Sequence, residues 1–230
     1  MARYHTILFD ADNTLLDFVR SEREALTDAL RALHVEPCEE MLQTYSRIND
    51  AVWKKLERGE IDKITLRTAR FVEFCEHYAL AVDPIVLAEH YLSALATKSF
   101  LMAGALEVCE HLAADCRLYI ITNGIAAVQH GRLDHSPLRP FFEEIFISDE
   151  IGVEKPDPAY FARVMARIPD FNPKTTLVVG DSLTSDIAGG IAAGLDTCWL
   201  NAKGKEPPKD MKITYVITRL EDVIPLALGA

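Results

Sequence analysis

Residues 5–14 read HTILFDADNT, a short apolar run followed by two aspartates, an asparagine and a threonine. A continuous apolar run of this length is typical of a strand that is buried on both faces of a parallel sheet. The aspartates Asp10 and Asp12 are separated by one residue, and in extended backbone such side chains point to the same side. The segment therefore predicts a buried strand whose end presents two carboxylates together.

Further apolar runs follow after residue 93, separated by helical or loop segments. They are RLYIITNG (117–124), EIFISDE (144–150), TLVVGDS (176–182), DTCWLN (196–201) and ITYVIT (213–218), and a terminal helix is expected around LEDVIPLAL (220–228). Strands and helices that alternate at this spacing indicate a parallel sheet with helices on both faces. We therefore expect an α/β fold whose core is a doubly wound, Rossmann-like parallel sheet.

Residues 17–93 have a different pattern, because their apolar residues recur at intervals of three and four. This spacing is typical of amphipathic helices, and turns expected at 34–37, 59–63 and 82–84 divide the segment into four of them. We expect a helical-bundle cap domain at 17–93, inserted into the first crossover of the sheet. The catalytic core would then consist of residues 1–16 and 94–230.

The composition argues against two classes of binding partner, nucleic-acid polymers and membranes. The chain has 24 Lys and Arg against 35 Asp and Glu, a net charge of -11, which argues against a nucleic-acid polymer as partner. No apolar run reaches the roughly 18 residues of a membrane span, and no signal peptide is visible, so we expect no membrane partner and a cytoplasmic location. The five cysteines form no CxxC pair, and we expect all of them to fill the core as reduced thiols.

Polar residues follow several of the predicted strands. Open α/β sheets bind ligands at the carboxyl ends of their strands. Besides Asp10 and Asp12, the chemistry-bearing residues at those ends are Thr122, Asn123, Lys155, Asp181 and Asp186. The sequence therefore gathers four acidic side chains, a hydroxyl and a lysine at one edge.

These residue types suit phosphate chemistry. Carboxylates brought together repel one another unless a cation joins them, and an all-oxygen, carboxylate-rich site suits Mg2+. Lys155 and Thr122 add a positive charge and a donor for the oxygens of a tetrahedral dianion. We expect Asp10 to attack phosphorus and form an aspartyl-phosphate. Asp12 would protonate the leaving alkoxide and then accept a proton from the hydrolytic water.

The segments DADNT, ITNG, Lys155 and GDSLTSD appear in the order of the four motifs of the haloacid dehalogenase (HAD) superfamily, and the resemblance covers essentially the whole chain. It implies Mg2+ held by the side chains of Asp10 and Asp181 and the main-chain carbonyl of Asp12, with Asp186 supporting or completing the site. It also implies that Thr122, Asn123 and Lys155 grip the phosphate, and that the helical insertion is a C1-type cap that closes over the substrate. Dehalogenases of the superfamily lack the second aspartate, so Asp12 points to phosphate esters.

Within the superfamily, four stretches resemble pyrimidine 5'-nucleotidases: ITNGIAAVQHGRL, SDEIGVEKPDPAYF, GDSLTSDIAGGIAAGLDTCWLN and, in the cap, INDAVWKKLERGEI. This resemblance implies hydrolysis of pyrimidine or deoxypyrimidine nucleoside monophosphates to nucleoside and phosphate. We expect the base or sugar to be recognised by cap and hinge residues, namely Phe18, Asn49, Trp53 and Arg70. Aromatic residues at helical spacing also build bundle cores, so packing is the alternative role for them.

Other functions keep the same chemistry or the same fold. The substrate could be a sugar phosphate, phosphoglycolate or an acylneuraminate phosphate, or the enzyme could be a phosphomutase that returns the phosphoryl group to a substrate. A phosphorylatable receiver-like signalling module also combines Asp, Thr and Lys on a doubly wound sheet. A receiver carries its acceptor aspartate at the third strand and has no insertion of this size, which disfavours that class.

Overall fold

The computed structural model describes residues 2–229, and its core is a six-stranded sheet in the order β3-β2-β1-β4-β5-β6. All neighbouring strands pair in parallel. The strands are β1 (Thr6–Phe9), β2 (Arg117–Thr122), β3 (Phe142–Ile147), β4 (Thr176–Gly180), β5 (Asp196–Leu200) and β6 (Tyr215–Ile217). The predicted doubly wound α/β fold is confirmed. The strand order reverses between β1 and β4, the place where such sheets bind ligands.

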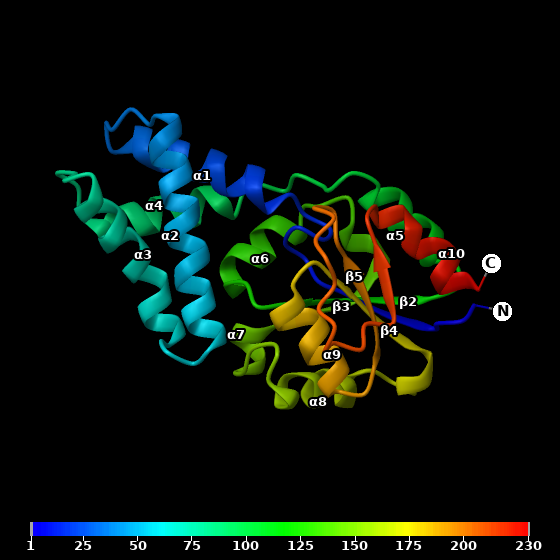
Figure 1. Ribbon diagram of the computed structural model, residues 1–230. Coiled ribbons are helices and arrows are strands. Elements are labelled where there is room, and N and C mark those ends of the chain that lie inside the picture. The colour runs from blue at the N-terminus through cyan, green and yellow to red at the C-terminus, as the bar shows by residue number, and fades with distance from the viewer. Residues whose placement is uncertain (1, 230) are drawn as a thin grey trace.

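Helices cover both faces of this sheet (Figure 1). On one face α5 (Ala105–Leu112) packs beside α10 (Val223–Leu228), and on the other lie α8 (Pro158–Arg167) and α9 (Ala188–Ala192). Along β1 the side chains alternate between the two layers: Ile7 and Phe9 belong to the first hydrophobic cluster and Leu8 to the second. Burial on both faces explains why this strand reads as an uninterrupted apolar run.

Four helices form the second part of the molecule: α1 (Phe18–Ala32), α2 (Glu39–Glu57), α3 (Lys63–His77) and α4 (Pro84–Leu95). Three begin at an aspartate whose side chain accepts a hydrogen bond from the first turn, the preferred N-cap arrangement. They enclose a hydrophobic cluster of their own, in which the rings of Tyr45, Phe71, Phe74 and Tyr91 contact one another. The four predicted helices are present, but α3 and α4 begin on the last residue of the predicted turns 59–63 and 82–84, and α4 continues to Leu95, beyond the expected boundary at 93.

Two chain segments, 10–17 and 96–104, connect the helical part to the sheet. They are held together by backbone hydrogen bonds from Asp17 N to Phe100 O (2.9 Å) and from Met102 N to Leu15 O (2.9 Å). Farther out, Lys63 of α3 forms an ion pair with Asp149 of α7 (Ser148–Ile151), 2.8 Å from Nζ to Oδ1. The helical part therefore stands beside the carboxyl ends of the strands, to the left of the sheet in Figure 1.

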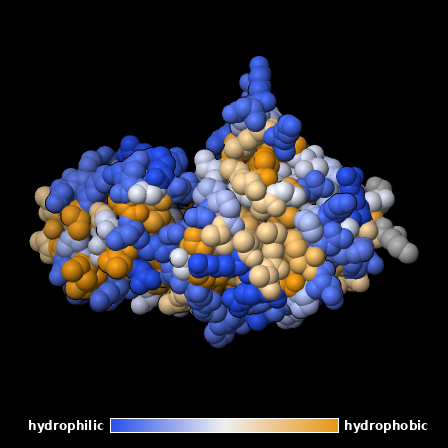
Figure 2. Space-filling model, turned by 90° about the horizontal axis from the view of Figure 1, so that it is seen from below, coloured by the Kyte–Doolittle hydropathy of each residue, from blue (hydrophilic) through white to orange (hydrophobic). Residues whose placement is uncertain are grey.

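The surface of both parts is largely hydrophilic in the view of Figure 2, with hydrophobic residues interspersed. In the span 2–229, no helix combines the length and the apolar character that crossing a membrane requires. Four cysteines are buried as expected, but Cys38 is exposed. The expectation was wrong for Cys38 because this residue precedes α2 at its solvent-facing N-cap position instead of lying on the apolar face of a helix.

Candidate active site

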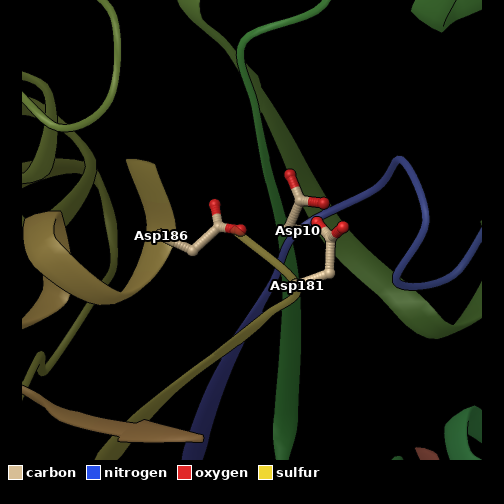
Figure 3. Close-up of side chains that lie close together, drawn as sticks. All are labelled: Asp10, Asp181 and Asp186. Atoms are coloured by element: carbon tan, nitrogen blue, oxygen red, sulfur yellow. The ribbon is translucent and has the colours of Figure 1, made fainter. Parts of the chain in front are cut away.

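Three carboxylates converge at the point where the strand order reverses. Asp10 follows β1 and Asp181 follows β4, while Asp186 projects from the short π-helix Leu183–Ile187 beyond β4. Each of the three offers an oxygen that lies within 4.8 Å of those of the other two. Figure 3 shows the groups of Asp10 and Asp181 side by side and that of Asp186 directed towards them. The aspartates that the sequence placed at two strand ends thus form one cluster.

Gly180 makes room for this cluster. A Cβ atom on Gly180 would lie 2.3 Å from Oδ2 of Asp186, closer than any real contact, so a larger residue would displace the carboxylate. The same Oδ2 accepts a hydrogen bond from the backbone N of Ser182 at 3.1 Å. The π-helical turn, a feature frequent at functional sites, therefore carries Asp186 back against the end of its own strand.

Lys155 is buried between two of the carboxylates. Its ammonium group donates to Oδ1 of Asp10 (2.8 Å), Oδ1 of Asp186 (2.7 Å) and the carbonyl oxygen of Ile121 (2.8 Å). All three of its hydrogens are thus used. The side chain of Asn123 holds the backbone of Lys155 through both groups: its Oδ1 accepts from Lys155 N and its Nδ2 donates to Lys155 O, each at 2.8 Å.

Burial and neighbouring charges shift the pKa values of Asp10, Asp181 and Lys155. Burial, reinforced by the charge of Asp186, raises the pKa of Asp10 well above its usual range, and Lys155 offsets only part of this. Burial and the same neighbour raise the pKa of Asp181 to about 7. Burial alone would lower the pKa of Lys155, but the carboxylates of Asp10 and Asp186 outweigh it and raise that pKa. A divalent cation would relieve this excess of negative charge, and three converging carboxylates are the hard oxygen donors that suit Mg2+.

Thr122 and Asp12 lie beside the cluster and share a partner. Oγ1 of Thr122 and Oδ2 of Asp12 each accept a hydrogen bond, both at 2.8 Å, from Nε2 of Gln129. Oδ1 of Asp12 accepts a hydrogen bond of 2.5 Å from Nη1 of Arg132. Both partners belong to α6 (Ala126–Leu133), and the sequence analysis did not single them out. The signal available was their spacing of three residues on the helix that follows Asn123.

A cavity of about 450 Å³ opens in front of these residues, between the sheet and α2. Its lining includes Phe18, Asn49 and Trp53 together with the carboxylate cluster, Thr122, Asn123 and Lys155. Charged residues that the sequence analysis did not select also line it; these are Asp50, Lys54 and Glu57 of α2, and Lys203 and Lys205 after β5. It therefore offers polar and aromatic contacts beyond the phosphate-sized space at the strand ends.

Arg70 is placed differently from the other cap residues. It is only 2% exposed, and in the part of the chain that the structure describes it does not belong to the lining of this cavity. Its Nη1 donates to Oδ1 of Asn49 at 2.6 Å, and Nδ2 of Asn49 donates to Oε1 of Glu22 at 2.7 Å. Arg70 thus lies behind Asn49 and fixes the orientation of its amide.

Comparison with known proteins agrees with this geometry. Residues 4–194 match the family of haloacid dehalogenase-like hydrolases. The chain is 38% identical to HAD-hydrolase YfnB of Bacillus subtilis over 97% of this chain and 95% of that protein. It is 37% identical to pyrimidine 5'-nucleotidase PynA of Streptococcus pneumoniae (96% and 94% covered) and 33% identical to pyrimidine 5'-nucleotidase YjjG of Escherichia coli (96% and 96% covered).

A crystal structure of YfnB, described as bound to magnesium, resembles this structure with a TM-score of 0.93 at 37% identity, covering 98% of this chain and 99% of that one. The chain belongs to the haloacid dehalogenase-like hydrolases. It is therefore an enzyme, a hydrolase, as the four motifs predicted. The resemblance to pyrimidine 5'-nucleotidases is likewise confirmed by two of these relatives.

Proposed function

We propose that this hydrolase is a Mg2+-dependent phosphomonoesterase, and specifically a 5'-nucleotidase that cleaves pyrimidine or deoxypyrimidine nucleoside monophosphates to nucleoside and phosphate. The observation that carries the proposal is the placement of Asp10, which is held by Lys155 at the switch point of the sheet, beside Asp181 and Asp186, at the base of a cavity. The relatives named pyrimidine 5'-nucleotidase support the substrate class.

Asp10 is the nucleophile in this proposal. Its Oδ1 accepts from Lys155 at 2.8 Å and its Oδ2 from Oγ1 of Thr14 at 3.2 Å, so the carboxylate has a fixed orientation. One of its oxygens attacks phosphorus, and the bond from phosphorus to the ester oxygen breaks. Lys155 would supply positive charge that offsets the charge building up on the phosphate oxygens, and the hydroxyl of Thr122 would donate to one of them. Asn123 would contribute by holding the backbone of Lys155.

Asp12 transfers the proton in both halves of the reaction. It protonates the alkoxide that leaves when the aspartyl-phosphate forms. It then accepts a proton from the water that attacks phosphorus, and the bond from phosphorus to Asp10 breaks, which regenerates the enzyme. A nucleoside alkoxide is a strong base, so this proton is required.

The side chains of Asp10 and Asp181 and the main-chain carbonyl of Asp12 would hold Mg2+, with Asp186 beside them. When bound, the ion supplies positive charge against the carboxylates and the phosphate oxygens. The balance of charges supports this assignment, because Lys155 is paired with two of three converging carboxylates, and burial together with the charge of Asp186 raises the pKa values of Asp10 and Asp181.

Residues 17–93 act in this proposal as a cap that closes over the substrate and excludes water. Phe18 and Trp53 line the cavity and would contact the base or the sugar. Asn49 is fully buried and hydrogen-bonded to Arg70 and Glu22, so it would support the wall of the cavity. Arg70 would contribute by holding the amide of Asn49.

A panel of phosphomonoesters with released phosphate as readout tests the proposal, with Mg2+ and with EDTA as control. We expect turnover of pyrimidine deoxynucleotides such as dUMP above that of purine nucleotides, sugar phosphates, phosphoglycolate and an acylneuraminate phosphate, and loss of turnover in EDTA and in Asp10→Asn. Full turnover by Asp10→Asn would exclude Asp10 as the nucleophile. A preference for another ester would overturn the substrate class, and an aspartyl-phosphate that persists for minutes without release would favour a signalling module.

A further inference from the structure

We propose that Arg132 is a positioning residue that, together with Gln129, orients the carboxylate of Asp12 for proton transfer and couples this orientation to helix α1 and to the segment 96–104 that returns to the sheet. The inference rests on the proposed function, in which Asp12 transfers the proton. Figure 1 shows α6, which carries both residues, between the helical part and the sheet.

The carboxylate of Asp12 is held through both of its oxygens. Each of its two carboxylate oxygens accepts one hydrogen bond from α6, Oδ1 from Arg132 and Oδ2 from Gln129. Arg132 and Gln129 are each 1% exposed, whereas the side chain of Asp12 is 26% exposed and lines the cavity. The two buried donors therefore fix the carboxylate from behind and leave it open to the substrate side.

Arg132 and Asp12 also neutralise one another. Asp12 is the carboxylate that pairs with the buried guanidinium of Arg132. A buried arginine is costly unless it is paired and hydrogen-bonded. The carboxylate of Asp12 therefore stabilises the buried guanidinium of Arg132, and the guanidinium holds the carboxylate in place. Nη1 of Arg132 also lies 3.3 Å from Oε1 of Gln129, which links the two donors to one another.

Arg132 also connects Asp12 to the helical part of the molecule. Nε of Arg132 donates to the carbonyl oxygen of Lys98 at 3.0 Å, in the segment that returns to the sheet. Its Nη2 lies 3.5 Å from Oγ of Ser21 on α1, and its guanidinium lies 5.9 Å from the centre of the Phe18 ring. One side chain thus links Asp12 to α1 and to the returning segment 96–104, so a shift of the helical part relative to the sheet displaces the group that holds Asp12.

Gln129 extends this arrangement to the phosphate side. Its Nε2 bridges Asp12 and Thr122, the residue placed at the phosphate. A Cβ atom on Gly124 would lie 2.4 Å from this Nε2, so the glycine of the ITNG segment leaves the space that the amide occupies. The orientation of Asp12 is therefore tied to the position of Thr122.

Arg132 acts without touching the substrate. Within residues 2–229 it does not line the large cavity, and it lines a separate cavity of about 30 Å³ behind Asp12. Removing its guanidinium is therefore expected to lower kcat and leave KM nearly unchanged. The loss should also depend on the leaving group, because p-nitrophenolate is a weak base that departs without a proton, whereas a nucleoside alkoxide needs one.

The test compares Arg132→Met, Arg132→Lys and Gln129→Leu with wild type in the Mg2+-loaded enzyme, using dUMP and p-nitrophenyl phosphate. For Arg132→Met we expect kcat on dUMP to fall about 10- to 100-fold with KM within about threefold. The first-turnover release of p-nitrophenolate should stay within about threefold of wild type. Arg132→Lys should restore part of the kcat because it keeps a charged donor, and Gln129→Leu should show the same dependence on the leaving group.

Arg117→Met is the matched control. Arg117 lies at the start of β2, at the opposite end of the strand from Thr122, and its Nε donates to Oε1 of Glu143 at 2.8 Å. This variant should behave as wild type. Equal losses for both esters in the first turnover, or a raised KM with unchanged kcat, would overturn the proposal. If Arg132→Met does not fold, Arg132→Lys and Gln129→Leu decide the matter by the same comparison. A wild-type enzyme that cleaves none of the esters would instead contradict the proposed function.

Discussion

The ammonium nitrogen of Lys155 lies 2.8 Å from Oδ1 of Asp10, and both residues are buried. These residues are 145 positions apart in the sequence, and Asp10 follows β1 whereas Lys155 comes after β3, so the contact exists because β1 and β3 lie on either side of β2 in the sheet. The pair fixes Asp10, the proposed nucleophile, at the place where the strand order reverses. It also places a cation where the phosphate oxygens would lie.

Replacing Lys155 with Met should remove most activity. The substitution leaves Asp10 and Asp186 without their shared donor and the phosphate without a cation, and loss of one such electrostatic group lowers kcat by about 100- to 1,000-fold. Released phosphate from dUMP measures the effect. Lys174→Met, a change at an exposed lysine, is the control, and a Lys155→Met enzyme within about threefold of wild type would contradict the assigned role.

The stability of the metal-free protein should depend on pH through Asp181. Burial and Asp186 raise its pKa from 3.8 to about 7, so between these values the folded protein keeps a proton that the unfolded chain has released. The contribution of Asp181 to stability without metal is therefore greatest below this window and is lost as the pH rises through it. Mg2+ competes with protons for the carboxylates and should stabilise the protein more above the window than within it.

Thermal unfolding at about pH 5.5 and about pH 8, in EDTA and in Mg2+, measures this dependence. We expect a lower Tm at the higher pH in EDTA and a larger increase with Mg2+ there. In Asp181→Asn, which cannot titrate at this position, both differences should shrink. Equal stabilisation by Mg2+ at the two pH values would count against the metal site.

The ion pairs between α3 and α7 should influence the position of the helical part. Asp149 accepts from Lys63 (2.8 Å) and Arg67 (3.1 Å), and its Oδ2 also accepts from Ala126 N, at the start of α6, at 3.0 Å. Partly exposed pairs contribute up to about 1 kcal/mol, which corresponds to a change of about fivefold in an equilibrium. Lys63→Met should therefore raise KM for dUMP by up to about fivefold with little change in the first-turnover rate.

Steady-state and first-turnover kinetics at low and high salt check this effect. Wild type should approach the behaviour of Lys63→Met at high salt, because screening weakens the exposed pair. Arg31→Met removes a pair within the helical part, 2.9 Å to Glu36, and should leave KM unchanged. A KM that changes equally in both variants would assign the effect to the stability of the bundle.

Hydrophobic patterning was sufficient to predict the sheet and the helical insertion, because most strands contain an apolar run and the helices α1 to α4 have a three- and four-residue period. The acidic cluster was predictable from the rule that strand ends meet at one edge. Arg132 and Gln129 were missed because their spacing of three residues indicates only that they share a face of α6, whereas their contacts with Asp12 depend on how α6 packs in the fold. Arg70 carries no sequence signal that distinguishes a residue behind Asn49 from one that faces the cavity.

Trp53 should contribute to affinity for the base and not to the chemistry. It lines the cavity from α2, and stacking of a base on an aromatic ring contributes about 1–3 kcal/mol when tested by alanine substitution. Trp53→Ala should therefore raise KM for dUMP by about 5- to 150-fold, with a smaller effect on kcat. Ribose 5-phosphate has the same ester linkage but no base, so its KM should change little in the same variant. Equal changes for the two substrates would show that Trp53 supports the packing of the bundle instead of contacting the base.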